Sequence, residues 1–147
     1  MNEALELMHA VARKLTGQAV TIRFKEPQTS RPANAATCKG LDGAAVIDID
    51  PYWNRPDDEL FRLFTHELAH VVLHLGIMTP VNVTIASAVY HAPSKSTDAV
   101  TRSREAEAEA LADKWRKFAM YGWENHYRVH RSRFISMLKA LLYDYNK

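Results

Sequence analysis

The stretch that decides the fold of this chain is Leu60-Phe61-Arg62-Leu63-Phe64-Thr65-His66-Glu67-Leu68-Ala69-His70-Val71-Val72-Leu73-His74-Leu75. Its apolar residues are almost continuous, and a run of this length is typical of a buried helix rather than a strand. Asn54 and Pro56 precede it as a capping residue and a first-turn proline, and Gly76 follows it as a stop. The pattern therefore predicts a central helix of about 19 residues that packs against the rest of the chain.

This helix contains a H-E-x-x-H pattern formed by His66, Glu67 and His70. Residues four apart lie on one face of a helix, so the two histidines can direct their ring nitrogens at one cation, at about 2.0–2.1 Å each for zinc. Glu67 lies about 100° further round the helix, where it can take a proton from a water that the ion activates. The alternative is a pair of hydrogen-bonded core histidines with a buried ion pair. A metal is favoured because polar groups in so apolar a helix are costly to bury without compensation.

A catalytic zinc usually has three protein ligands, so the pattern requires one more. His74 repeats the spacing of four residues. However, it lies about 12 Å along the helix axis from His66, because each residue rises about 1.5 Å. The two side chains cannot both bind one ion, and His74 is interpreted as a helix-end residue close to the site.

The acidic segment at residues 105–109 offers carboxylates for the third position. Glu105 and Glu109 continue at helical spacing onto polar faces, and solvated surface glutamates are the alternative interpretation for them. Glu107 is followed at helical spacing by large apolar residues, which predicts that it lies on a buried face: Leu111, Trp115 and Phe118. Glu105 is the fallback ligand. The predicted metal ligands are His66, His70 and Glu107.

Composition bounds the class of protein. With 147 residues, 47% hydrophobic and 24% charged, the chain is typical of a single globular domain, residues 1–147. The net charge of +2 gives no strong argument for a nucleic-acid partner. Cys38 is the only cysteine, which excludes an intrachain disulfide and favours a reducing compartment. The sequence shows neither a signal peptide nor a membrane span, so a cytoplasmic protein is expected.

Before the central helix, residues 2–15 have the periodicity of an amphipathic helix, and residues 19–24 and 43–50 alternate as strands do. A shorter strand at residues 36–39 can pair with the last of these across a turn at residues 40–43. These segments predict a small antiparallel sheet that precedes the central helix.

After the central helix, residues 77–102 are weakly patterned and fit either an edge strand or a short helix. Helical periodicity returns from residue 98 or 103 to residue 121, where Gly122 is expected to end the helix. A last helix is predicted at residues 125–145. The expected fold is α+β, with a small antiparallel sheet packed on a helical core around the H-E-x-x-H helix.

Two segments together resemble the motifs of the ImmA/IrrE-type zinc metallopeptidases. The H-E-x-x-H-x-x-x-H helix of that family matches His66-Glu67-Leu68-Ala69-His70-Val71-Val72-Leu73-His74. Its second, Glu-Ala-Asn-x-Phe-Ala-like helix is similar to Arg104-Glu105-Ala106-Glu107-Ala108-Glu109-Ala110-Leu111-Ala112. The match puts the metal-binding glutamate of the family on Glu107. The resemblance covers residues 44–118, with Glu109 in place of the usual Asn.

The resemblance implies a gluzincin-like, zinc-dependent endopeptidase, in which another divalent metal such as Mn²⁺ can replace Zn²⁺. Members of the family are often encoded by phages or integrative elements and cleave a helix-turn-helix repressor. The implied partner is thus a protein substrate inside the cell, such as the repressor of a phage or mobile element. Glu67 is expected to act as general base and then to protonate the leaving amine. Candidate donors to the oxyanion are Tyr90, His91, His126, Tyr127 and His130.

Two other functions compete with peptide hydrolysis. A catalytically weak or inactive regulator would keep the metallopeptidase scaffold to bind a partner protein. Alternatively, a basic segment would contact nucleic acid, although a solvated helix face is the better interpretation of it: Arg128, His130, Arg131 and Arg133. A SprT-like protease is disfavoured because the cysteines of a zinc ribbon are missing. No pattern indicates the oligomeric state.

Overall fold

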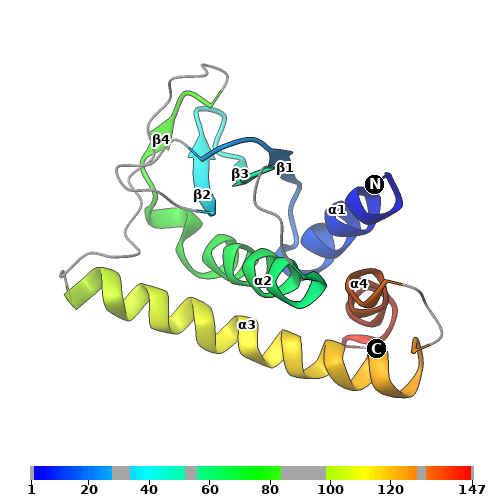
Figure 1. The fold of residues 1–147 in the computed structure, drawn as a ribbon. Helices are drawn as coiled ribbons and strands as arrows, with labels where there is room; N and C mark the ends of the chain where they lie inside the picture. The colour runs from blue at the N-terminus through cyan, green and yellow to red at the C-terminus, as the bar shows by residue number, and fades with distance from the viewer. Residues whose placement is uncertain (1, 28–33, 52–55, 84–98, 129–131, 147) are drawn as a thin grey trace.

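The structure, a computed structural model, describes residues 2–27, 34–51, 56–83, 99–128 and 132–146 (Figure 1). The elements in chain order are α1 (Asn2–Thr16), β1 (Val20–Phe24), β2 (Ala35–Gly40), β3 (Ala45–Ile49), α2 (Asp57–His74), the 3₁₀ turn η1 (Leu75–Ile77), β4 (Pro80–Val81), α3 (Ala99–Asn125) and α4 (Arg133–Asp144). The described residues thus form four α-helices and one four-stranded sheet, which confirms the expected α+β class.

The sheet is mixed, and the prediction of an antiparallel sheet is wrong in this respect. The strand order is β1-β3-β2-β4, with β2 antiparallel to β3 but β1 parallel to β3 and β4 parallel to β2. The hairpin between β2 and β3 is the predicted one, and Gly43 turns it with a φ of 87°, a conformation that favours glycine. Every residue of β3 is buried. This strand therefore takes an interior position, and β1 pairs along the side that β2 leaves open.

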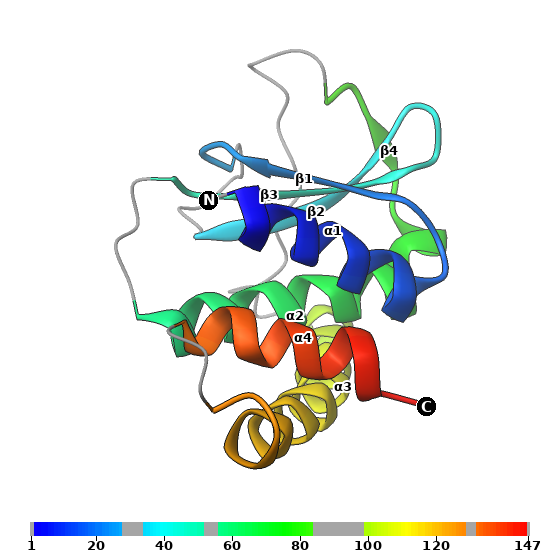
Figure 2. The same ribbon diagram turned by 90° about the vertical axis from the view of Figure 1, so that its right-hand side faces the viewer.

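The helices cover one face of the sheet, and α2 lies between the sheet and α3 (Figures 1 and 2). Alternate residues of β1 and β3 join the main core on this face: Val20, Ile22, Ala45, Ile47 and Ile49. The opposite face carries a partly buried ion pair, in which Nε of Arg23 donates to Oδ1 of Asp48 at 2.7 Å. The central helix is therefore buried along most of its length, although Val72 and Leu73 near its end are exposed.

The start of α2 lies where the sequence predicted it, but Pro56 is the N-cap residue and not a first-turn proline, and the predicted cap Asn54 lies outside the described residues. Pro56 is the N-cap residue in an extended conformation, and Asp57, Asp58 and Glu59 occupy the first turn, where their carboxylates complement the positive end of the helix. Asp57 also accepts a hydrogen bond from Oγ of Ser132 at 3.1 Å. This bond ties the beginning of α2 to the beginning of α4.

Gly122 does not end α3, contrary to the sequence prediction, and the helix continues to Asn125. The reason for a glycine here is close packing, because a Cβ atom at this position would lie 2.5 Å from Cβ of Ala140 in α4. The last helix consequently begins later than predicted. Its N-cap residue is Ser132, whose side chain accepts a hydrogen bond from the backbone N–H of Ile135.

Only part of the weakly patterned region before α3 falls within the described residues. Pro80 and Val81 form β4 and pair with Lys39 and Gly40 of β2, as expected for an edge strand. The alternative of a short helix at residues 84–90 lies outside the described residues. None of the helices in the described ranges is long and apolar enough to cross a membrane.

Candidate metal centre

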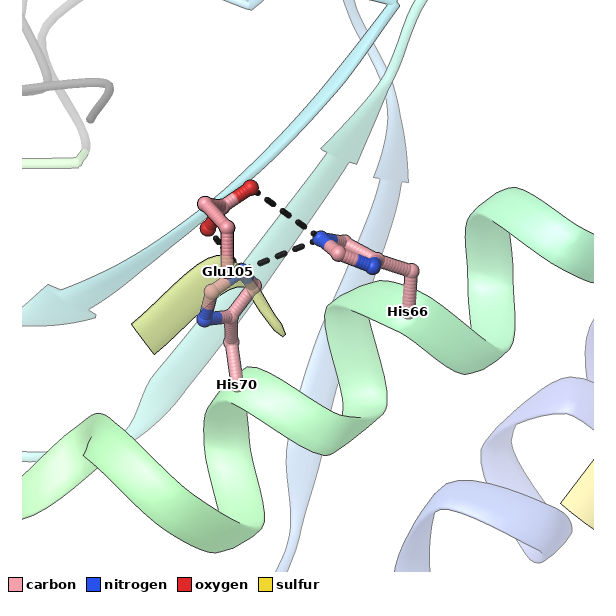
Figure 3. A group of neighbouring side chains, drawn as sticks. All are labelled: His66, His70 and Glu105. Carbon is pink, nitrogen blue, oxygen red and sulfur yellow. Dashed lines mark hydrogen bonds and ion pairs between the residues drawn. The ribbon is translucent and has the colours of Figure 1, made fainter. Parts of the chain in front are cut away.

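His66 and His70 project from the same face of α2 towards α3 (Figure 3). Their Nε2 atoms lie 3.2 Å apart, and their rings meet edge to face with centroids separated by 4.8 Å. The side chain of His70 is buried and that of His66 is partly buried. The helical spacing of four residues has therefore brought two ring nitrogens to one point, as the sequence predicted.

Glu105 of α3 reaches this point from the opposite side (Figure 3). Its Oε1 atom lies 3.2 Å from Nε2 of His66, and its Oε2 atom lies 2.6 Å from Nε2 of His70. The three side chains each offer one ligand atom, and these atoms all lie within 4.8 Å of one another. Within the described residues, this is the one group of His, Cys, Asp or Glu side chains arranged to hold a metal ion.

The chemistry of these three side chains fits a divalent cation. Oε2 of Glu105 is buried and makes no hydrogen bond of acceptable geometry with the described residues, in spite of its short contact to His70. Two imidazole nitrogens and a carboxylate oxygen thus converge on one small volume, where a divalent cation would compensate them. Two histidines and a glutamate are also a known ligand set of catalytic zinc, which leaves a further coordination position open.

The pKa values of Glu105 and His66 reflect their contact with each other. Burial raises the pKa of Glu105, but the neighbouring His66 and His70 outweigh it and lower that pKa to about 2. Burial lowers the pKa of His66, but the hydrogen bond to Glu105 and the charge of Glu67 outweigh it and raise that pKa. A carboxylate that stays ionised in a partly buried position is ready to bind a cation at neutral pH.

Glu67 is buried beside the two histidines and faces the sheet. The hydroxyl of Thr37 in β2 donates a hydrogen bond of 2.6 Å to Oε1 of Glu67. Glu67 itself is buried. A buried carboxylate needs such a partner, and this one also fixes its rotamer. Thr37 was not singled out in the sequence. Its position in a short strand next to the H-E-x-x-H helix becomes apparent only from the packing of β2 on α2.

A second row of polar side chains surrounds the three inner ones. Nδ1 of His66 lies 3.7 Å from Oε1 of Glu109, which in turn accepts a hydrogen bond of 2.6 Å from Arg116. Nδ1 of His70 lies 3.0 Å from Nδ1 of His74. Both histidines of the candidate centre therefore have their outer ring nitrogens directed at another polar group, which is common for histidines that bind a metal.

The structure brings Glu105 to the two histidines, whereas Glu107, the predicted ligand, lies elsewhere. The side chain of Glu107 is 58% exposed, and its Oε1 atom lies 3.9 Å from Nε2 of His74. The prediction that Glu107 belongs to the buried face of its helix is thus wrong, and the fallback residue Glu105 takes its place.

The error has a physical cause in the packing of α3. The prediction followed the largest side chains, yet Leu111 and Phe118 are only partly buried. The buried face instead consists mainly of small residues at alternating spacings of four and three: Ala108, Ala112, Trp115, Ala119 and Gly122. Glu105 precedes Ala108 by three residues and extends this face. The series of small residues at this spacing is the signal in the sequence that places Glu105 on the buried face of α3.

Among the candidate donors to the oxyanion, the two that the structure describes lie far from the candidate metal centre. His126 and Tyr127 follow the end of α3, about 30 Å along the helix from Glu105. Tyr90, His91 and His130 lie outside the described residues.

The basic segment that suggested nucleic-acid binding is partly used in packing. The guanidinium of Arg133 stacks on the ring of Trp123 at 4.1 Å, and its Nε atom lies 3.1 Å from Oδ1 of Asp58. Arg128 is exposed, and His130 and Arg131 lie outside the described residues. Arg133 therefore holds α4 against α3 and α2.

Comparisons with protein-family models, with curated proteins and with solved structures found no match to this chain.

Proposed function

We propose that this protein is a zinc-dependent peptidase whose metal ligands are His66, His70 and Glu105. The observation that carries the proposal is the convergence of two imidazole nitrogens and a carboxylate oxygen within 4.8 Å, one residue away from the buried carboxylate of Glu67. A cation held by three protein ligands keeps a position for water or substrate. Zinc is the first choice for this ligand set, and Mn²⁺ is an alternative.

The roles of the side chains follow from their positions. When bound, the metal would supply Lewis acidity to the scissile carbonyl and to a water molecule. Glu67 accepts the proton of that water and returns a proton to the leaving amine, a contribution that is typically worth about 10²–10⁴-fold in rate. Thr37 holds the carboxylate of Glu67 in one orientation through its hydrogen bond of 2.6 Å. Glu109 and Arg116 restrain the ring of His66 from the outer side.

The substrate in this proposal is a peptide bond of an intracellular protein. The resemblance of the two motifs to the ImmA/IrrE-type metallopeptidases supports a transcriptional repressor of a phage or mobile element as that protein. The competing function, a regulator that binds a partner without cleaving it, shares the same residues and differs only in turnover.

The experiment compares zinc-loaded wild type with Glu67→Gln on a mixture of peptides derived from a bacterial proteome, with new amino termini identified by mass spectrometry. Wild type is expected to produce cleavages that Glu67→Gln lacks, while both bind one zinc per chain. Glu59→Gln is the matched control, since Glu59 lies exposed in the first turn of the same helix. If Glu67→Gln cleaves as wild type does, the proposed general base is wrong. If zinc-loaded wild type cleaves no peptide, the regulator is favoured.

A further inference from the structure

His74 lies one helical turn beyond His70 at the end of α2 and contacts the ring nitrogen of His70 that faces away from Glu105. The Nδ1 atoms of the two histidines lie 3.0 Å apart, and the ring centroids lie 5.1 Å apart. His74 is only 6% exposed. The contact between the two rings is therefore shielded from water. The hydrogen bond between them decides which ring nitrogen of each histidine carries a proton.

The direction of this hydrogen bond follows from the proposed role of His70. A ring nitrogen that binds a metal carries no proton, so a His70 that binds through Nε2 carries its proton on Nδ1. This Nδ1–H then donates to Nδ1 of His74, which must be the unprotonated nitrogen of that ring. The proton of His74 consequently lies on its Nε2 atom.

Nε2 of His74 is buried and has no hydrogen-bond partner among the described residues. Glu107 of α3 places its Oε1 atom 3.9 Å from it. A carboxylate at this distance attracts a protonated ring nitrogen, directly after a small rotation or through one water molecule. Each of two glutamates on α3 thus faces a different histidine of α2: Glu105 faces His70, and Glu107 faces His74.

We infer that His74 is a positioning residue that fixes the ring orientation and the protonated nitrogen of His70, and that Glu107 influences the metal only through His74. The inference rests on the proposed metal site. Side chains that orient metal ligands in this way change metal affinity by about 10–100-fold when they are replaced. Neither His74 nor Glu107 is a ligand itself.

Metal affinity measured by competition with a chromogenic zinc chelator tests this inference on the full chain. His74→Phe removes the acceptor and should weaken zinc binding about 10–100-fold. His74→Asn should restore most of the affinity, because the amide oxygen can accept from Nδ1–H of His70. Glu107→Ala should weaken binding less than His74→Phe does, and should have no further effect in the His74→Phe background. Glu124→Ala, at an exposed position of the same helix, is the control.

A long-range ¹H–¹⁵N spectrum of the zinc-loaded protein provides a readout that packing alone would not change. It should show a slowly exchanging proton on Nδ1 of His70 in wild type and in His74→Asn, and faster exchange of that proton in His74→Phe. Full affinity in a folded His74→Phe variant would overturn the inference. So would equal losses caused by Glu107→Ala in the wild-type and His74→Phe backgrounds. If His74→Phe fails to fold, a loss of affinity in Glu107→Ala supports the inference, and full affinity in Glu107→Ala overturns it. If wild type binds no zinc, or binds it without Glu105, the proposed function has failed instead.

Discussion

Nε2 of His66 and Oε1 of Glu105 lie 3.2 Å apart although 39 residues separate them in the chain. This contact joins α2 to α3, a helix whose buried residues are mostly alanine. Small residues let two helices approach closely, so that the side chain of a glutamate on one helix reaches the face of the other. The candidate metal centre is therefore a product of helix packing as much as of the H-E-x-x-H pattern.

The first prediction separates the two glutamates. Glu105→Ala should reduce bound zinc to well below one ion per chain after dialysis, because a ligand is lost. Glu107→Ala, the matched variant two residues away, should retain more zinc than Glu105→Ala after the same dialysis. Elemental analysis of both purified proteins measures the difference. Equal occupancy in the two variants would mean that Glu105 does not bind the metal.

The second prediction concerns Thr37. Thr37→Val keeps the shape of the side chain but removes the donor to Glu67, which leaves a buried carboxylate without that partner. We expect a loss of about 1–3 kcal/mol in the free energy of unfolding, measured with urea. The rate of peptide hydrolysis should fall as well. Thr37→Ser, which keeps the hydroxyl, is the control and should lose much less. A Thr37→Val protein as stable as wild type would show that the bond contributes nothing.

The third prediction tests the contact between α3 and α4. Gly122→Ala would place a Cβ atom 2.5 Å from Cβ of Ala140, so the helices must separate. Overpacking of a core usually costs about 1–3 kcal/mol, whereas alanine in a helix gains only about 1 kcal/mol over glycine. We therefore expect a net loss of stability in thermal unfolding. Gly76→Ala is the control, because no heavy atom lies within 4 Å of a Cβ built there. A Gly122→Ala variant more stable than wild type would contradict the packing.

The fourth prediction concerns the pH dependence of the metal-free protein. The pKa of Glu105 is lowered from 4.5 to about 2, so its contribution to stability is present above pH 4.5 and is lost as the pH falls towards 2. The pKa of His66 is raised from 6.5, so its contribution is present below pH 6.5 and is lost as the pH rises above that. In the presence of a chelator, the destabilisation caused by Glu105→Gln should be larger at about pH 5.5 than at about pH 8.5. Urea unfolding at the two pH values measures it, and the opposite order would contradict the pairing.

The sequence determined the central helix and the two histidines because both depend on local periodicity. The start of α2 at Pro56, the hairpin at Gly43 and the common face of His66 and His70 all follow from residues a few positions apart. The same local argument explains why the overall α+β class could be predicted.

What the sequence could not determine depends on contacts between distant segments. The parallel pairing of β1 with β3 is set by which strand occupies the interior of the sheet, and strand patterns do not contain that information. The choice of Glu105 over Glu107 depends on whether α3 packs through its large or its small side chains. From the local sequence alone, Gly122 predicts the end of a helix. Its close contact with Ala140 of α4 explains the glycine, and that contact is known only from the structure.

The close contact at Gly122 is a point about which α3 can tilt, and Glu105, the proposed metal ligand, lies near the other end of that helix. Glu105 lies 17 positions before Gly122, roughly 25 Å along the helix, so a tilt of about 5° around that contact would move the carboxylate by about 2 Å. Metal coordination tolerates about 0.2 Å. Metal affinity would then change with the angle of α3 before unfolding becomes measurable.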